Sequence, residues 1–144
     1  LSEQFRSHSL SKIYHALVHG QMREKSGTLI AYLQKNHKTN ETAVFTSPGD
    51  GRQRAELAYE TVQTSKNYSL IKIDLKTGRS HQIRAQLASA GCPIVGDTKY
   101  GAHDNWTKGT IALASTSITF KLATSDEHKT ITMDIPRPWI KFLT

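Results

Sequence analysis

The sequence of 144 residues contains a single cysteine, Cys92, and only four prolines. One cysteine cannot form a disulfide within the chain or supply a cysteine-based zinc site, so we expect it to fill a small space beside Gly91 and Pro93. No apolar run approaches the length of a membrane span, and no signal peptide is visible. Internal repeats and low-complexity tracts are also absent. We therefore expect a cytoplasmic protein.

Positive charge is what the sequence has in excess. Nineteen Lys and Arg residues against twelve Asp and Glu residues give a formal net charge of +7 and a pI near 9.6. Lysine and arginine neutralise phosphates and release counterions, which indicates a polyanionic partner such as RNA. Because these cations are spread along the chain, generic solubilising charge remains the alternative. A hydrophobic content of 37% suits one domain, residues 1–144, with a real core and no second domain.

Alternation of apolar and polar residues predicts most of the strands. The predicted strands are residues 12–20, 40–45, 54–62, 69–75, 110–122 and 129–135, whereas residues 27–36 fit either a strand or a short helix. We expect 54–62 to pair antiparallel with 69–75, and residues 1–6 to be the tail of a helix. The core candidates of the last hairpin are Ile111, Leu113, Ile118, Phe120, Ile131, Met133 and Ile135, and Trp139 and Phe142 should pin the C-terminal segment. The pattern predicts an α+β fold, a mostly antiparallel mixed sheet flanked by a few helices.

A strand, a turn and a helix in succession organise the middle of the chain. The strand ends at Thr77-Gly78, and the helix that follows should have Ser80 as its N-cap, Ile83, Leu87 and Ala90 on its buried face, and Gly91 and Pro93 as its stop. Arg84 then lies on a rigid element, with His81 one turn earlier on the same side. Spacing leaves two interpretations: a solvated surface cation, or an arginine at the edge of a cleft that binds a carboxylate or phosphate through its planar fork.

Two sets of residues raise the possibility of a metal site. His15 and His19 would share one face of a helix, but in a strand they lie far apart and no third ligand is near. His81, Asp97 and His103 could serve a metal-dependent hydrolase, although their spacing matches no zinc pattern. We predict no metal site.

The stretch Thr-Gly-Arg-Ser-His-Gln-Ile-Arg at 77–84, followed by Gly91, Pro93-Ile94, Gly96-Asp97 and Tyr100-Gly101, resembles the signature of the RluA-type RNA pseudouridine synthases. Lys12, Tyr14, Ala16, Val18 and Gly20 match a second pattern of that family, and the resemblance runs from about Phe5 to Pro136. It implies that Arg84 pairs with the catalytic aspartate and that Tyr14 stacks on the target uracil. It further implies RNA contacts at Lys12, Arg79, His81 and Gln82. The implied reaction is isomerisation of uridine to pseudouridine in rRNA or tRNA, with neither a metal nor an organic cofactor.

One departure from the family matters for activity. The nucleophilic aspartate of the family lies in a His-Arg-Leu-Asp segment followed by Thr-Ser-Gly, upstream of the strand that holds the tyrosine, and this sequence has no such segment. We therefore expect the C-terminal part of a synthase catalytic domain, with the N-terminal part missing: a monomer that binds RNA and is inactive alone. The alternative is a non-catalytic basic RNA-binding module. In the complete enzyme, Arg84→Met should abolish turnover with little loss of stability, because the aspartate left behind could protonate or take up water.

Overall fold

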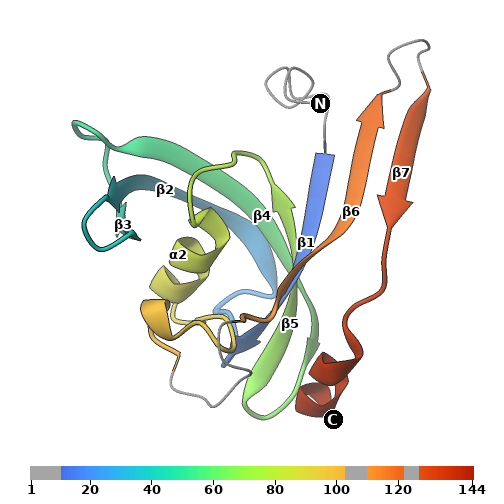
Figure 1. Ribbon diagram of the computed structural model, residues 1–144. Helices are drawn as coiled ribbons and strands as arrows, with labels where there is room; N and C mark the ends of the chain where they lie inside the picture. Colours follow the sequence, from blue (N-terminus) through green and yellow to red (C-terminus); the bar gives the residue numbers. More distant parts are fainter. Residues whose placement is uncertain (1–10, 103–109, 122–126) are drawn as a thin grey trace.

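The computed structural model describes residues 11–102, 110–121 and 127–144. Seven strands form one sheet in the spatial order β3-β2-β4-β5-β1-β6-β7, and every neighbouring pair is antiparallel (Figure 1). The strands are β1 (Ser11–His19), β2 (Ser26–Asn36), β3 (Glu41–Phe45), β4 (Gln53–Thr64), β5 (Tyr68–Leu75), β6 (Leu113–Lys121) and β7 (His128–Thr132). One α-helix, α2 (Gln82–Ser89), and two 3₁₀ helices, η1 (Thr98–Tyr100) and η2 (Arg137–Leu143), accompany them in the described part of the chain. The predicted α+β fold is confirmed.

The strand with ambiguous periodicity, β2, is defined by its neighbours. It pairs with β3 along one edge and with β4 along the other, so the two ladders satisfy its backbone groups. Local sequence could not decide between strand and helix because that decision came from pairing with residues up to 34 positions away, such as Ser26 with Glu60. The predicted pairing of β4 with β5 is confirmed, with a connecting loop shorter than expected.

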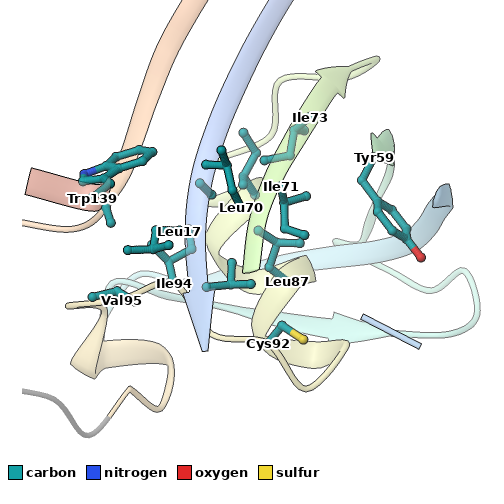
Figure 2. Close-up of a cluster of buried hydrophobic side chains, with 14 of the residues drawn as sticks. Leu17, Tyr59, Leu70, Ile71, Ile73, Leu87, Cys92, Ile94, Val95 and Trp139 are labelled. Atoms are coloured by element: carbon teal, nitrogen blue, oxygen red, sulfur yellow. The ribbon is translucent and has the colours of Figure 1, made fainter. Parts of the chain in front are cut away.

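Apolar side chains from β1, β4 and β5 meet α2 and the segment after it in the main core (Figure 2). Leu17, Ile71, Ile73, Leu87 and Ile94 are fully buried there. Val18 forms an isolated antiparallel bridge with Ile94, which draws the segment after α2 against β1. A sheet buries the apolar side chains of one face only when a second layer covers them. These contacts therefore hold α2 against the sheet.

Two expectations about packing are confirmed, one for Cys92 and one for the C-terminal segment. Cys92 is 1% exposed within the core, and burial raises the pKa of its thiol, so it behaves as an apolar filler. Trp139 is buried in η2, and Phe142 contacts Tyr68 edge-on with ring centroids 4.9 Å apart. The C-terminal segment is therefore held by aromatic packing against the end of β5.

The last hairpin departs from the prediction at its outer strand. Ile131 lies in the edge strand β7, whose five residues are all exposed, and Met133 directly follows it; their side chains are 57% and 61% exposed. Ile111, Leu113 and Ile135 do pack against the core, partly buried. The predictions for residues 1–6 and for His103 lie outside the described residues. No helix in the described ranges is long and apolar enough to cross a membrane.

Candidate active site

Helix α2 begins at a strained residue rather than at a capping side chain. Its N-cap is His81 in the left-handed conformation, with φ 54°, and no side chain caps the helix. Ser80 is exposed and offers only its carbonyl oxygen, which accepts from Thr42 Oγ1 at 3.0 Å. The prediction of Ser80 as N-cap is therefore wrong, because the helix begins one residue later than expected and its N-cap is His81. A left-handed non-glycine residue costs about 1–2 kcal/mol, which the contacts of His81 described below must offset.

The buried face of α2 agrees with the prediction except at its C-terminal end. Ile83 and Leu87 are buried as expected, and Gly91, with φ 89°, follows the last turn. Ala90 is exposed, however, because the helix ends at Ser89 before its buried face comes round again.

The turn before α2 is held by Gln82, which is 3% exposed. Its Oε1 accepts from Thr77 Oγ1 at 2.8 Å and from the Arg79 backbone N–H at 3.0 Å, and its Nε2 donates to the Glu56 carbonyl at 3.1 Å. The amide thus satisfies three partners on the turn and on β4. Gln82, which the resemblance assigns to RNA contact, thus also holds the turn in place through its buried amide.

Arg84 makes a two-point ion pair with Asp97. Arg84 Nε lies 2.9 Å from Asp97 Oδ2, and Nη2 lies 2.9 Å from Oδ1. The side chain of Asp97 is 1% exposed and that of Arg84 is 22% exposed. These hydrogen bonds raise the pKa of Arg84, so the guanidinium stays charged. Of the two interpretations that spacing left open, the structure shows the second, an arginine fork that binds a carboxylate, here that of Asp97.

Asp97 is the functional residue that sequence reasoning missed. It stands in the Gly96-Asp97 pair of the family pattern, yet nothing in its spacing from Arg84 assigned it a role. The signal available was a carboxylate separated only by Gly96 from the apolar stretch Pro93-Ile94-Val95 and shortly after the helix stop, a position where burial is costly unless a cation lies nearby.

A hydrogen-bonded chain extends from Arg84 through His81 to the sheet edge. Arg84 Nη1 lies 3.3 Å from His81 Nε2, and because a guanidinium only donates, Nε2 accepts and the proton resides on Nδ1. Nδ1 then donates to Tyr100 Oη at 2.9 Å, which also accepts from the Thr42 N–H at 2.8 Å. Burial, followed by the charges of Arg84, Lys99 and Lys35, lowers the pKa of His81, which keeps the ring neutral at pH 7.

One pocket of about 260 Å³ collects all the predicted site residues. Tyr14, Leu75, Ile83 and Leu113 make its apolar wall. Its polar side consists of Lys12, Gly78, Arg79, His81, Gln82 and Arg84. The β1–β6 ladder shifts register between Ile13 and Tyr14, an irregularity of the kind that re-aims side chains beside sites. None of the residues lining this pocket is an aspartate or glutamate, so within the described ranges it offers a base-sized recess with cations and no nucleophilic carboxylate.

The remaining predicted residues have identifiable partners. Arg79 Nε donates to the Arg54 carbonyl at 2.9 Å, the backbone contact expected of a residue in this turn. His15 Nδ1 lies 2.7 Å from Thr116 Oγ1. His81 and Asp97 both bond to Arg84, so a guanidinium fills the place that the hydrolase hypothesis would give to a metal. In the part of the chain that the structure describes, no three His, Cys, Asp or Glu residues are grouped to hold a metal ion, and His103 lies outside that part.

Comparison with known proteins gives a consistent picture. Residues 1–89 match the family model described as RNA pseudouridylate synthase. Ribosomal large subunit pseudouridine synthase D of Zymomonas mobilis is 36% identical over 101 residues, which cover 70% of this chain and 31% of that protein. A tRNA pseudouridine synthase C from Haemophilus ducreyi is 35% identical over 116 residues, which cover 73% of this chain and 47% of that protein. The chain spans about a third of the length of several such curated relatives.

Two solved human structures share the fold. Human RNA Pseudouridylate Synthase Domain Containing 4 superposes with a TM-score of 0.79 at 18% identity, covering 99% of this chain and 64% of that one. Human RNA Pseudouridylate Synthase Domain Containing 1 gives a TM-score of 0.78 at 20% identity, covering 95% and 58%. At these identities the likeness concerns the fold alone.

Proposed function

This chain belongs to the RNA pseudouridylate synthase family, and we propose that it forms the base-binding part of a synthase that isomerises uridine to pseudouridine within RNA. The observation that supports the proposal is the convergence of Tyr14, His81 and Arg84 on one pocket from β1 and from the start of α2. Tyr14 is more than sixty positions away from His81 and Arg84 in the sequence, so its meeting with them is a property of the fold.

We propose that the target uridine is flipped out of its stack into this pocket, with its uracil against Tyr14. In the reaction, an aspartate attacks the nucleoside and the bond between C1′ and N1 breaks. The uracil rotates, a bond forms between C1′ and C5 as the bond to the aspartate breaks and releases the carboxylate, the C5 proton leaves, and N1 takes up a proton. Substrate and product therefore have the same atoms, and none of these proposed steps uses a cofactor.

The nucleophilic aspartate is proposed to come from a part of the protein outside this sequence. Support comes from the pocket lining, which contains no carboxylate among the described residues, and from the greater length of the curated relatives. The Nε edge of Arg84 is engaged by Asp97, whereas its Nη1 end lies beside His81 in the pocket lining. We assign the pairing with the incoming nucleophile to this Nη1 end.

The partner is proposed to be rRNA or tRNA, since relatives are named for each, and the protein to act as a cytoplasmic monomer. The basic net charge supports an RNA partner. Lys12 and Arg79 line the pocket and are assigned to phosphate contacts at its rim.

Release of tritium from RNA labelled at C5 of uridine, measured with the complete protein that contains this chain, tests the proposal. Arg84→Met should lower the single-turnover rate about 10²- to 10³-fold, as expected for loss of a charged group at the reacting centre, with less than about threefold change in RNA affinity. Arg84→Lys should recover part of the rate, since an ammonium keeps the charge but loses the two-point geometry. A single-turnover rate unchanged in Arg84→Met would contradict the role of Arg84. RNA binding with no tritium release from the complete protein would favour the alternative, a non-catalytic RNA-binding module.

A further inference from the structure

Two exposed lysines lie beyond the pocket, on the side of His81 that faces the β2–β3 hairpin. Lys35 is near the end of β2, and Lys99 is in η1. Neither forms an ion pair with a carboxylate among the described residues. Both charges are close enough to His81 to lower its pKa, after the larger effects of burial and of Arg84.

The elements that carry these lysines are fastened to the start of α2. Lys99 Nζ donates to the Asn40 carbonyl at 3.2 Å, which ties η1 to the hairpin turn. Thr42 bonds to Tyr100 Oη through its N–H and to the Ser80 carbonyl through its hydroxyl. Lys35 is paired with Thr42 in the β2–β3 ladder. The hairpin end, η1 and the pocket entrance therefore form one connected unit, and Figure 1 shows β3 and α2 side by side.

The charge of this unit is positive. Asp97, the nearest buried carboxylate, is neutralised by Arg84. Glu41 is the one acidic side chain on β3, and it is paired in the ladder with Asn36 rather than with Lys35. Lys35 and Lys99 therefore present positive charge on a preformed surface, and exposed cations of this kind attract phosphates.

We propose that Lys35 and Lys99, here called the hairpin cations, bind backbone phosphates of the RNA next to the flipped uridine. The inference rests on the proposed function, because a nucleotide inside the pocket places its flanking phosphates just beyond the entrance. Sequence-independent phosphate contact suits RNA, whose deep major groove cannot be read by side chains. The hairpin cations thus extend the RNA-binding surface from the pocket onto η1 and the β2–β3 hairpin.

Fluorescence anisotropy with a labelled RNA stem-loop that has a uridine in its loop tests this proposal on the chain itself. The double variant Lys35→Gln/Lys99→Gln should weaken binding about tenfold at about 0.1 M salt and reduce the slope of log K against log salt by about 1 to 2. The matched control is Lys129→Gln/Lys141→Gln, which removes the same charge from β7, at the opposite edge of the sheet, and from η2. The control should change affinity less than about twofold.

A third variant, Lys99→Arg, separates charge from structure. Arginine keeps the positive charge, so its RNA affinity should stay within about twofold of the parent even if the contact with Asn40 changes. Equal weakening by the two double variants, or parental affinity in Lys35→Gln/Lys99→Gln, would overturn the hairpin cations as a phosphate site while leaving the proposed function in place. Failure of the parent chain to bind the stem-loop at any salt concentration would count against both proposals.

Discussion

At the scale of single residues, Asp97 decides how Arg84 behaves. The carboxylate is almost completely buried and receives two hydrogen bonds from one guanidinium. A buried ion pair contributes little net stability, but removing one partner leaves an uncompensated charge. Arg84 therefore serves the fold as well as the proposed chemistry.

This arrangement changes the expectation for Arg84→Met. Sequence reasoning predicted a modest loss of stability in the complete enzyme, on the premise that the partner of Arg84 is the nucleophilic aspartate, which could protonate or take up water. With Asp97 at 1% exposure, we expect a loss of about 3–5 kcal/mol in the free energy of unfolding, measured by urea denaturation of this chain. The double variant Arg84→Met/Asp97→Asn should regain part of it, since the amide carries no charge. A midpoint of Arg84→Met equal to that of the parent would show that Asp97 can be solvated in the folded state.

Two histidines should make stability fall in mild acid. Burial and then Arg84, Lys99 and Lys35 lower the pKa of His81, and burial and then Lys72 lower that of His15. Because each folded-state pKa lies below the unfolded value of about 6.5, the unfolded chain binds more protons as pH falls through that value. The stability present above pH 6.5 should therefore decrease as pH falls toward the folded-state pKa values.

Urea denaturation between pH 8 and pH 5 measures this dependence. The variant His15→Gln/His81→Gln should show a flatter profile over the same range. His37→Gln, an exposed histidine on the hairpin turn, should leave the profile of the parent unchanged. A parent profile that is flat between pH 7 and pH 5 would contradict the assignment of neutral His15 and His81.

At the scale of elements, the turn from β5 into α2 is stabilised by a buried amide instead of a helix cap. Gln82 bonds to Thr77, Arg79 and Glu56, while the hydroxyl of Ser80 makes no cap. This turn positions Arg79, His81 and Arg84, so its stability determines the shape of the pocket.

If Ser80 were the N-cap, as the sequence pattern predicted, Ser80→Ala would be a damaging substitution in this turn. The structure instead predicts the larger loss of stability for Gln82→Ala. Gln82→Ala should lower the free energy of unfolding by about 1–3 kcal/mol, because it removes the buried amide oxygen that accepts from the half-buried Thr77 hydroxyl and Arg79 N–H. Ser80→Ala should cost less than about 0.5 kcal/mol, whereas a true N-cap would cost about 1 kcal/mol. Thermal and urea denaturation of both variants check the ranking. A larger effect at Ser80 than at Gln82 would restore the serine as the N-cap.

At the scale of the whole molecule, the sheet places cations around a pocket without supplying a nucleophile. Of the aspartates in the described part of the chain, Asp97 pairs with Arg84 and Asp74 pairs with Lys76, and none lines the pocket. Within the described residues, the pocket therefore has the cations that the proposed function uses but no carboxylate that could attack the nucleoside.

We therefore expect this chain by itself to convert no uridine to pseudouridine. Tritium release from C5-labelled RNA should stay at the level of a protein-free control even when the chain is in excess over RNA. The same preparation should bind the stem-loop, which shows that it is folded and competent to contact RNA. Tritium release above the control would mean that an aspartate of this chain acts as nucleophile, and Asp→Asn variants would identify which one.

What the sequence by itself determined follows from short-range pattern. Alternation located the strands β1, β4 and β5, and the motif at 77–84 placed Arg79, His81, Gln82 and Arg84 near one another. Composition indicated a basic protein with one buried thiol. Each of these properties depends on residues within a turn or a strand length of one another, so local periodicity is enough to reveal them.

The tertiary structure decided the rest through contacts that no local pattern encodes. It made residues 26–36 a strand by pairing them on both sides, left Ile131 and Met133 exposed on an uncovered edge, and moved the N-cap to His81. It also joined Arg84 to Asp97 and His81 to Tyr100, and brought Tyr14 from a distant strand to the same pocket. Burial and charge pairing depend on which segments meet in space, and that is settled only when the whole sheet has assembled.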